Sequence, residues 1–153
     1  MGNGIAINTA GRVGIGTVTP SQKLHVIGNI LASGTITPNS DVNAKTDFAP
    51  VDPTLILERV AKLPIQQWRF KTEIAEVKHV GPMAQDFRAA FGLGEISTAI
   101  ATVDADGVAL AAIQGLNRKL EEQRAENADL KERLAQLEQL VHSLARQTRE
   151  SAR

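Results

Sequence analysis

The chain has 153 residues, and its 17 basic and 17 acidic side chains cancel, so nothing in its charge favours binding to nucleic acid or to an anionic membrane. It has no cysteine, which excludes disulfides, thiolate catalysis and the common cysteine-ligated zinc sites. No apolar run is long enough to span a membrane and no signal peptide is recognisable, so we expect a soluble protein without an export signal.

The segment up to residue 38 predicts short β-strands separated by turns, because β-branched residues alternate along it and Gly, Asn or Pro interrupts them. The expected strands are 4–8, 9–12, 13–16, 23–26 and 34–37. They contain little apolar mass, so we expect them to pair with copies of themselves or to continue a longer upstream structure. Met1-Gly2-Asn3-Gly4 is typical of an arbitrary start, and we expect the chain to be a fragment.

Ser40 and Lys45 place a hydroxyl and an amine five residues apart, where two differently composed segments meet. A serine hydroxyl is a weak nucleophile, and a lysine amine that burial keeps neutral can activate it as a general base. The alternative interpretation is structural, because Ser-Asp pairs cap helices and most lysines are solvated. These residues alone leave both interpretations open.

The middle of the chain predicts a small α+β unit. All five aromatic residues lie between positions 48 and 91, so we expect the core there. Helices are predicted at 53–62, which Pro53 begins, and at 84–91. Strands are predicted at 65–71 and 77–82, joined by a polar turn.

No metal or cofactor site is predicted. Asp104–Gly107 resembles the start of a calcium loop, but the later ligands are absent, so we predict a β-turn there. His25, His79 and His142 lie in three different segments, and none has a second ligand at metal spacing.

From Ile113 onward, apolar residues recur at alternating steps of three and four, which indicates a coiled-coil seam. Taking Ile113 as position a, the pattern favours parallel self-association, with charge pairs such as Glu126 and Lys131 between neighbouring helices. An Asn at a favours dimers whereas Leu at a and d is permissive, so the pattern leaves the strand number open. The seam residues are Ile113, Leu116, Leu120, Gln123, Asn127, Leu130, Leu134, Leu137, Val141 and Leu144.

Five blocks of sequence follow one another in a characteristic order: 40–45, 60–64, 68–71, 79–87 and 103–116. Together they resemble the C-terminal intramolecular chaperone domain of phage tail fibres and tailspikes, the endosialidase-type peptidase S74 family. The resemblance covers roughly residues 39 to 140, and residues 13–26 also resemble the short β repeat that commonly precedes this domain. Many members have Arg-Leu at Asn43-Ala44 and an apolar residue at Pro82.

The resemblance implies a homotrimer that assembles the preceding fibre and then severs itself by autocatalytic cleavage. Ser40 would be the catalytic nucleophile, Lys45 the base, and the Asn39–Ser40 bond the cleavage site. Asp41 would orient or cap rather than catalyse. His79 and Gln85 would make supporting contacts, or serve only in packing between strand and helix.

We therefore expect a β-rich fibre-end segment at 1–39, an α+β chaperone core at 40–110 and a coiled-coil trimerisation helix at 111–153. The expected partners are copies of the chain and its own upstream fibre portion, with no nucleic acid, membrane or cofactor. Assembly is expected in the cytoplasm of the host bacterium, with the upstream part in a virion tail fibre and the cleaved domain released. Whether the chain comes from a phage or a prophage is left open.

A second interpretation is a structural trimeric fibre tip or adhesin end that never cleaves and stays attached, with Ser40 only a cap. An enzyme acting on other molecules has no support, because the chain has no paired carboxylates, no Ser-His-Asp arrangement in a plausible context and no cofactor loop.

Overall fold

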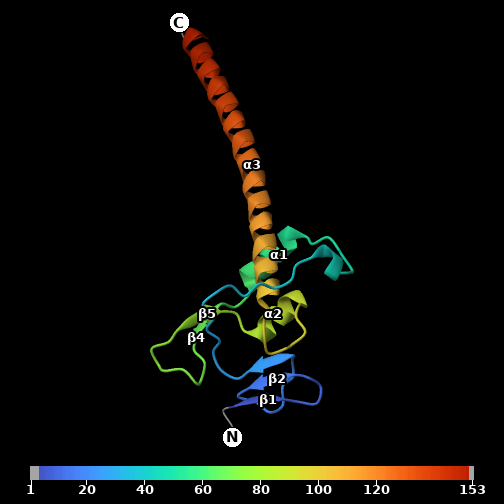
Figure 1. Cartoon of the computed structure of the whole chain (residues 1–153). Coiled ribbons are helices and arrows are strands. Elements are labelled where there is room, and N and C mark those ends of the chain that lie inside the picture. The colour runs from blue at the N-terminus through green and yellow to red at the C-terminus, as the bar shows by residue number, and fades with distance from the viewer. Residues whose placement is uncertain (1–3, 152–153) are drawn as a thin grey trace. The chain divides into compact units, whose positions relative to one another are not determined.

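The computed structural model describes residues 4–151, and these form an α+β structure in two compact units that divide between Ala44 and Lys45 (Figure 1). The first unit contains a three-stranded sheet, and the second contains a two-stranded sheet and the α-helices. In chain order the elements are β1 (Ile5–Ile7), β2 (Val13–Ile15), β3 (Leu24–Val26), the 3₁₀ turn η1 (Val42–Ala44), α1 (Pro53–Lys62), β4 (Gln66–Trp68), β5 (His79–Gly81), α2 (Ala84–Phe91) and α3 (Thr102–Ser151).

The first unit confirms three of the five predicted strands, and the other two predictions are wrong. Residues 9–12 form a turn because the Asn8 side chain accepts hydrogen bonds from the N–H groups of Ala10 and Arg12, each at 3.0 Å. Gly11 adopts a φ of 66°, which glycine tolerates better than other residues. The segment 34–37 has no strand partner among the described residues, and Ile36 remains 76 % exposed.

The central strand β2 pairs with β1 in an antiparallel sense and with β3 in a parallel sense. Only residues 16–23 connect the two parallel strands, although a crossover usually needs a dozen residues or more. The connection is compact because it turns back over Gly14, where an added Cβ would overlap the carbonyl oxygen of Thr17. A larger residue at position 14 would therefore displace the loop.

Local signals in the second unit give the helices and strands that the sequence predicts. The Asp52 carboxylate caps α1 by accepting from the N–H groups of Thr54 and Leu55, and Pro53 stands in the first turn. Gly92 ends α2 with a φ of 69°. Strands β4 and β5 pair in an antiparallel sense, which confirms the predicted partnership, although both are shorter than predicted.

The long helix α3 starts at Thr102, eleven residues before the first seam residue, so the β-turn predicted at Asp104–Gly107 is wrong. Two physical features favour helix over turn at these residues. Asp104 lies in the first turn, where a negative charge interacts favourably with the helix dipole. Val108 and Ala112 are buried one and two turns later, so packing stabilises the start of the helix.

The core of the second unit lies where α1 crosses α3. Gly115 permits this crossing, because a Cβ there would overlap the carbonyl oxygen of Pro53 and lie 3.0 Å from the Cβ of Leu57. Glu58 of α1 and Lys119 of α3 form an ion pair at 3.9 Å. Phe87, Val108 and Ala112 are buried in this unit, and so is Pro53 at the start of α1.

The face of α3 that contacts α1 is not the face that bears the predicted seam. With about 100° between successive residues, Val108, Ala112 and Gly115 lie on one side of α3, and the seam lies roughly a quarter turn away. Beyond this crossing, α3 continues past α1 and α2 without another described element of the second unit beside it (Figure 1). None of the helices in residues 4–151 combines the length and hydropathy needed to cross a membrane.

Candidate functional site

The segment from Asn39 to Lys45 is built around one tight turn. The Asn39 side chain accepts a hydrogen bond from the N–H of Asp41 at 3.0 Å, which bends the chain at Ser40. The 3₁₀ turn η1 follows, closed by a bond from Ala44 N–H to the Asp41 carbonyl at 3.1 Å. Because a 3₁₀ helix rises only about 2 Å per residue, the turn brings positions 40 and 45 closer than an extended chain would.

Asp41 shapes this turn through its side chain. One carboxylate oxygen accepts the Asn43 backbone N–H at 2.9 Å and the Asn43 side-chain amide at 3.0 Å. A carboxylate occupied in this way orients the loop, as an Asx turn does. The geometry fits the orienting role expected for Asp41.

Every residue from Asn39 to Pro50 is exposed in the single chain, including Ser40 and Lys45. A lysine amine acts as a base only when it is neutral, and at neutral pH that requires a desolvated environment. The single chain supplies the serine, the lysine and the turn between them. The burial that dyad chemistry needs must come from another surface.

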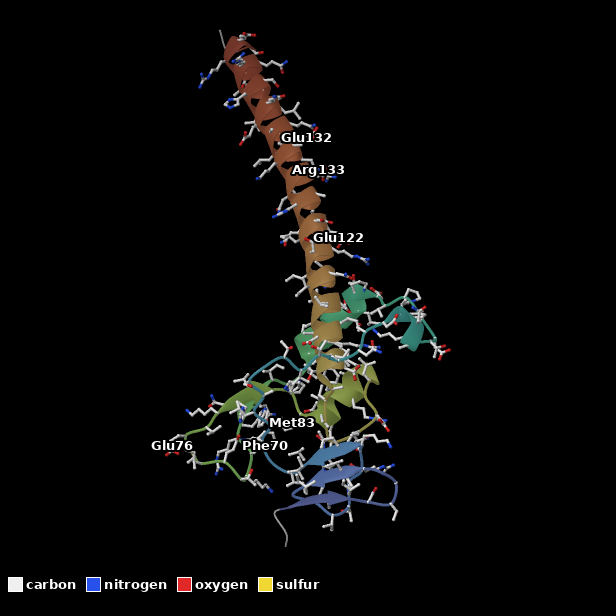
Figure 2. The ribbon with its side chains drawn as sticks, in the orientation of Figure 1. Phe70, Glu76, Met83, Glu122, Glu132 and Arg133 are labelled. Atoms are coloured by element: carbon white, nitrogen blue, oxygen red, sulfur yellow. The ribbon has the colours of Figure 1, made fainter. Side chains whose placement is uncertain are left out.

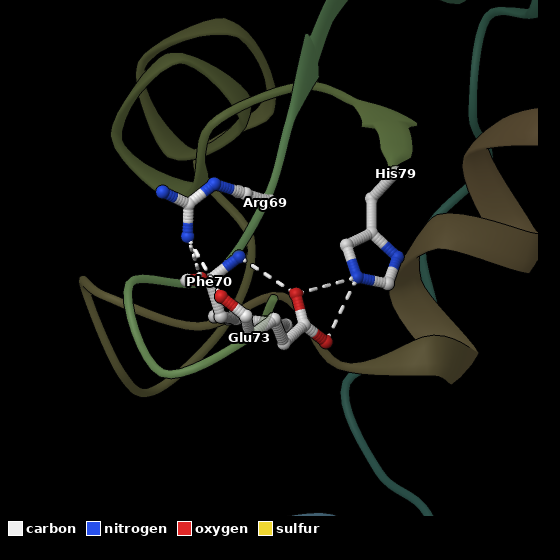
Figure 3. A network of polar contacts seen from close by, with 4 residues as sticks. All are labelled: Arg69, Phe70, Glu73 and His79. Atoms are coloured by element: carbon white, nitrogen blue, oxygen red, sulfur yellow. Dashed lines mark hydrogen bonds and ion pairs between the residues drawn. The ribbon is translucent and has the colours of Figure 1, made fainter. Parts of the chain in front are cut away.

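His79 belongs to a polar cluster within the β4–β5 hairpin. Glu73 lies in the connecting loop, and its two carboxylate oxygens are 3.0 and 3.1 Å from the Nε2 of His79 (Figure 3). The same carboxylate accepts a hydrogen bond from the Phe70 backbone N–H at 2.8 Å. The Arg69 side chain, in the same loop, donates a hydrogen bond to the Glu73 backbone carbonyl at 2.8 Å. The Glu73 side chain is only 15 % exposed, so the cluster fixes the loop against the strands.

The electrostatics of this cluster favour a charged Glu73. The hydrogen bond from Phe70 N–H holds the pKa of the Glu73 carboxyl below its ordinary value of 4.5. The hydrogen bond and charge of His79 and the charge of Arg69 act in the same direction, whereas burial opposes them. The carboxylate is therefore an anchor for the loop at neutral pH.

Aromatic rings surround the cluster and border an open groove. Trp68 lies 4.7 Å from the His79 ring and 4.9 Å from the Phe70 ring, measured between centroids. Its indole N–H is buried and has no hydrogen-bond partner among the described residues. The groove beside it has a volume of about 660 Å³, and the exposed Gln85 lines it together with Met83. The structure thus gives His79 packing partners and places Gln85 at the groove.

The seam residues of α3 are exposed in the single chain. Among the apolar ones the exposed fraction runs from 43 % at Leu120 to 63 % at Ile113 and Val141. Charged side chains such as Glu132 and Arg133 project from the same helix (Figure 2), and Arg133 pairs with Asp129 at 3.0 Å. This part of α3 presents an apolar stripe that the other described residues of the second unit do not cover.

Two residues that organise this unit were not predicted from the sequence. Glu73 lies in a polar loop, and only the pairing of β4 with β5 brings it to His79. Gly115 lies inside a helical pattern, where a glycine normally costs stability, and that anomaly is the signal that could have identified a close crossing. Among residues 4–151, no three His, Asp or Glu side chains gather as metal ligands would.

Comparison with known proteins gives one family match and a relative. The sequence model of the Peptidase S74 family, described as "Chaperone of endosialidase", matches residues 40–92. Myelin regulatory factor homolog 1 of Caenorhabditis elegans is 35 % identical over 77 residues. That alignment covers 49 % of this chain and 8 % of the relative, so the two proteins share one stretch of sequence.

The family match and the geometry concern the same stretch. The match starts at Ser40, includes Lys45, and continues through the β4–β5 hairpin to the glycine that ends α2. Members of this family are intramolecular chaperones with an autoproteolytic serine peptidase activity, and they act on their own chain. Residues 40–92 of the chain therefore carry a Peptidase S74 domain.

Proposed function

We propose that this chain is an intramolecular chaperone that trimerises through α3, assembles the β-structured fibre portion upstream of it, and then releases itself by cutting the Asn39–Ser40 bond. Ser40 is the nucleophile and Lys45 the general base. The observation that carries the proposal is the family match beginning at Ser40, directly before the turn that leads to Lys45.

The proposed chemistry uses the two side chains on either side of η1. Ser40 Oγ attacks the carbonyl carbon of Asn39 while Lys45 Nζ accepts the hydroxyl proton. The Asn39–Ser40 C–N bond breaks as the Ser40 nitrogen takes a proton from Lys45, which leaves an ester between Asn39 and Ser40 Oγ. Water then hydrolyses the ester, so residues 1–39 end in a carboxylate and residue 40 begins the released domain.

Assembly would set the time of the cut. Lys45 is exposed in the single chain, and a neighbouring copy is the surface that would desolvate its amine. The exposed stripe on α3 supports such an assembly, because heptad spacing over more than four repeats predicts a parallel coiled coil. The polar layers at Gln123 and Asn127 would fix the register, and a trimer is the state implied by the family resemblance.

The upstream unit supports the proposal that the chain is part of a fibre. Its strands are short and connected by tight turns, and residues 13–26 resemble the β repeat that precedes this domain in fibre proteins. The C. elegans relative is named as a regulatory factor, so the support for a fibre comes from the upstream β unit and not from that relative. In this proposal, assembly and cleavage occur in the host bacterial cytoplasm, and the upstream part enters a virion tail fibre.

A denaturing gel of purified full-length protein tests the cleavage. The wild type should lose a fragment of about 4 kDa, scaled from 39 residues of a 16.4 kDa chain. Ser40→Ala and Lys45→Ala should stay intact. Lys45→Arg is the matched control for charge, because it keeps the positive side chain but cannot serve as a base.

Two measurements separate cleavage from assembly. Analytical ultracentrifugation of Ser40→Ala should give a trimer, and a monomer or dimer would remove the proposed architecture. A wild-type chain that stays uncut as a confirmed trimer would instead favour the structural fibre tip, in which Ser40 is only a cap.

A further inference from the structure

The three-stranded sheet of the first unit is two-faced. The registers pair Ile5 with Ile15 and Ile15 with Val26 in one row, and Ile7 with Val13 and Val13 with Leu24 in another. Residues paired directly across a ladder lie on the same face of a sheet. One face therefore carries six aliphatic side chains and no polar one. We call this set the aliphatic face: Ile5, Ile7, Val13, Ile15, Leu24 and Val26.

The opposite face has a different chemistry and a different environment. The alternate positions are Ala6, Gly14 and His25, which are small or polar. The turn after β2 folds over this side, since an added Cβ on Gly14 would overlap the Thr17 carbonyl oxygen. The connecting loop of the unit thus covers the side that has little apolar surface to bury.

The aliphatic face remains open. Ile5 and Ile7 are each 73 % exposed and Leu24 is 56 % exposed. The rest of the unit, from Ile27 to Ala44, forms no further strand that could cover them. A sheet of three three-residue strands has little other apolar surface to bury, and an apolar face left in water is typical of an interaction site.

We propose that the aliphatic face docks against the aliphatic faces of other copies of this chain, forming a dry core between the sheets. The inference rests on the proposed function, because self-association through α3 brings identical sheets together at high effective concentration. The face has no charge, so it matches a second aliphatic surface and leaves no buried ion unpaired. Sheets that pack face to face in this way interdigitate their inward side chains.

Thiol labelling tests this face directly, because the sequence has no cysteine and a single introduced one is a unique probe. In a Ser40→Ala background, Ile7→Cys reports the aliphatic face and its neighbour Ala6→Cys the opposite face. Leu24→Cys, on the other outer strand, is a second probe of the same face. The reference is the same chain dissociated by Leu134→Asp and Leu137→Asp in the α3 seam, and oligomeric state is checked by ultracentrifugation.

At Ile7→Cys and Leu24→Cys, the reaction with a maleimide should be at least about tenfold slower in the assembly than in the dissociated chain. At Ala6→Cys the two rates should agree within about twofold. Equal rates at both aliphatic probes in a confirmed oligomer would overturn the docking while leaving the proposed function intact. Equal protection at Ala6→Cys would show that the docking is not specific to the aliphatic face, which would overturn this inference. A monomeric Ser40→Ala chain would overturn both the docking and the proposed function.

Discussion

Glu73 illustrates how one carboxylate can hold a loop. It accepts the Phe70 N–H at 2.8 Å and contacts His79 through both oxygens, so the β4–β5 connection is fixed at both ends (Figure 3). Hydrogen bonds to an ionised acceptor are stronger than neutral ones. Deleting the charge would leave the Phe70 N–H and the His79 ring with a weaker acceptor.

We predict that Glu73→Gln destabilises the second unit at neutral pH and flattens its acid transition. The folded pKa of Glu73 lies below 4.5, so its contribution is fully present above the unfolded pKa and is lost as pH falls through the folded one. Urea unfolding followed by fluorescence of Trp68, the single tryptophan, measures this between pH 7 and pH 3.

Glu76→Gln is the matched control, because Glu76 lies in the same loop with an exposed side chain (Figure 2). Its unfolding should follow the parent chain at every pH. An acid transition in Glu73→Gln as steep as that of the parent would show that the carboxylate contributes nothing to the folded state.

At the scale of elements, α1 and α3 depend on a close crossing. Gly115 allows the Pro53 carbonyl to approach the axis of α3, and Val108 and Ala112, earlier in the same helix, are buried. Gly107 lies in the same helix, yet an added Cβ there meets no other atom within 4 Å. The two glycines therefore respond differently to the same substitution.

Gly115→Ala should destabilise the second unit by about 1–3 kcal/mol, because the added methyl forces α1 away from α3. Gly107→Ala should instead stabilise it by about 0.5–1 kcal/mol through helix propensity alone. Urea unfolding of both variants in the Ser40→Ala background gives the comparison. If Gly115→Ala were as stable as Gly107→Ala, the crossing would not need the glycine.

At the scale of the whole molecule, the exposed apolar residues of the α3 seam determine how the copies would assemble. The seam of α3 is exposed along its length, and its two polar layers at Gln123 and Asn127 would reduce stability in exchange for a defined register. Removing one polar layer should therefore raise stability and reduce specificity together.

We expect Asn127→Leu to raise the stability of the assembly by about 1 kcal/mol or more per chain, since each buried CH₂ contributes about 0.8 kcal/mol. Ultracentrifugation should then find more than one oligomeric state. Glu132→Leu, which adds the same side chain at the outermost heptad position, should give neither effect. A single, less stable species for Asn127→Leu would contradict the seam assignment.

The elements that were predicted correctly are those whose signals lie in neighbouring residues of the sequence. Pro53 in the first turn of α1 and Gly92 at the end of α2 mark helix ends without help from distant residues, and both helices were predicted correctly. Asp104–Gly107 was misassigned because packing at Val108 and Ala112 overrides the turn tendency of Asp and Gly. The Glu73–His79 contact depends on the register of the β4–β5 hairpin, which the residue pattern did not specify. The Ser40–Lys45 dyad remains a prediction.

The brevity of β1, β2 and β3 has a consequence for synthesis. The sheet is complete long before α3 exists, because 75 residues separate Val26 from Thr102. At about 5–20 residues per second, that interval lasts roughly 4–15 s, during which the aliphatic side chains have no partner helix to gather them. Strands of three residues offer few free backbone groups to neighbouring nascent chains, so their shortness would protect against aggregation while the rest of the chain is made.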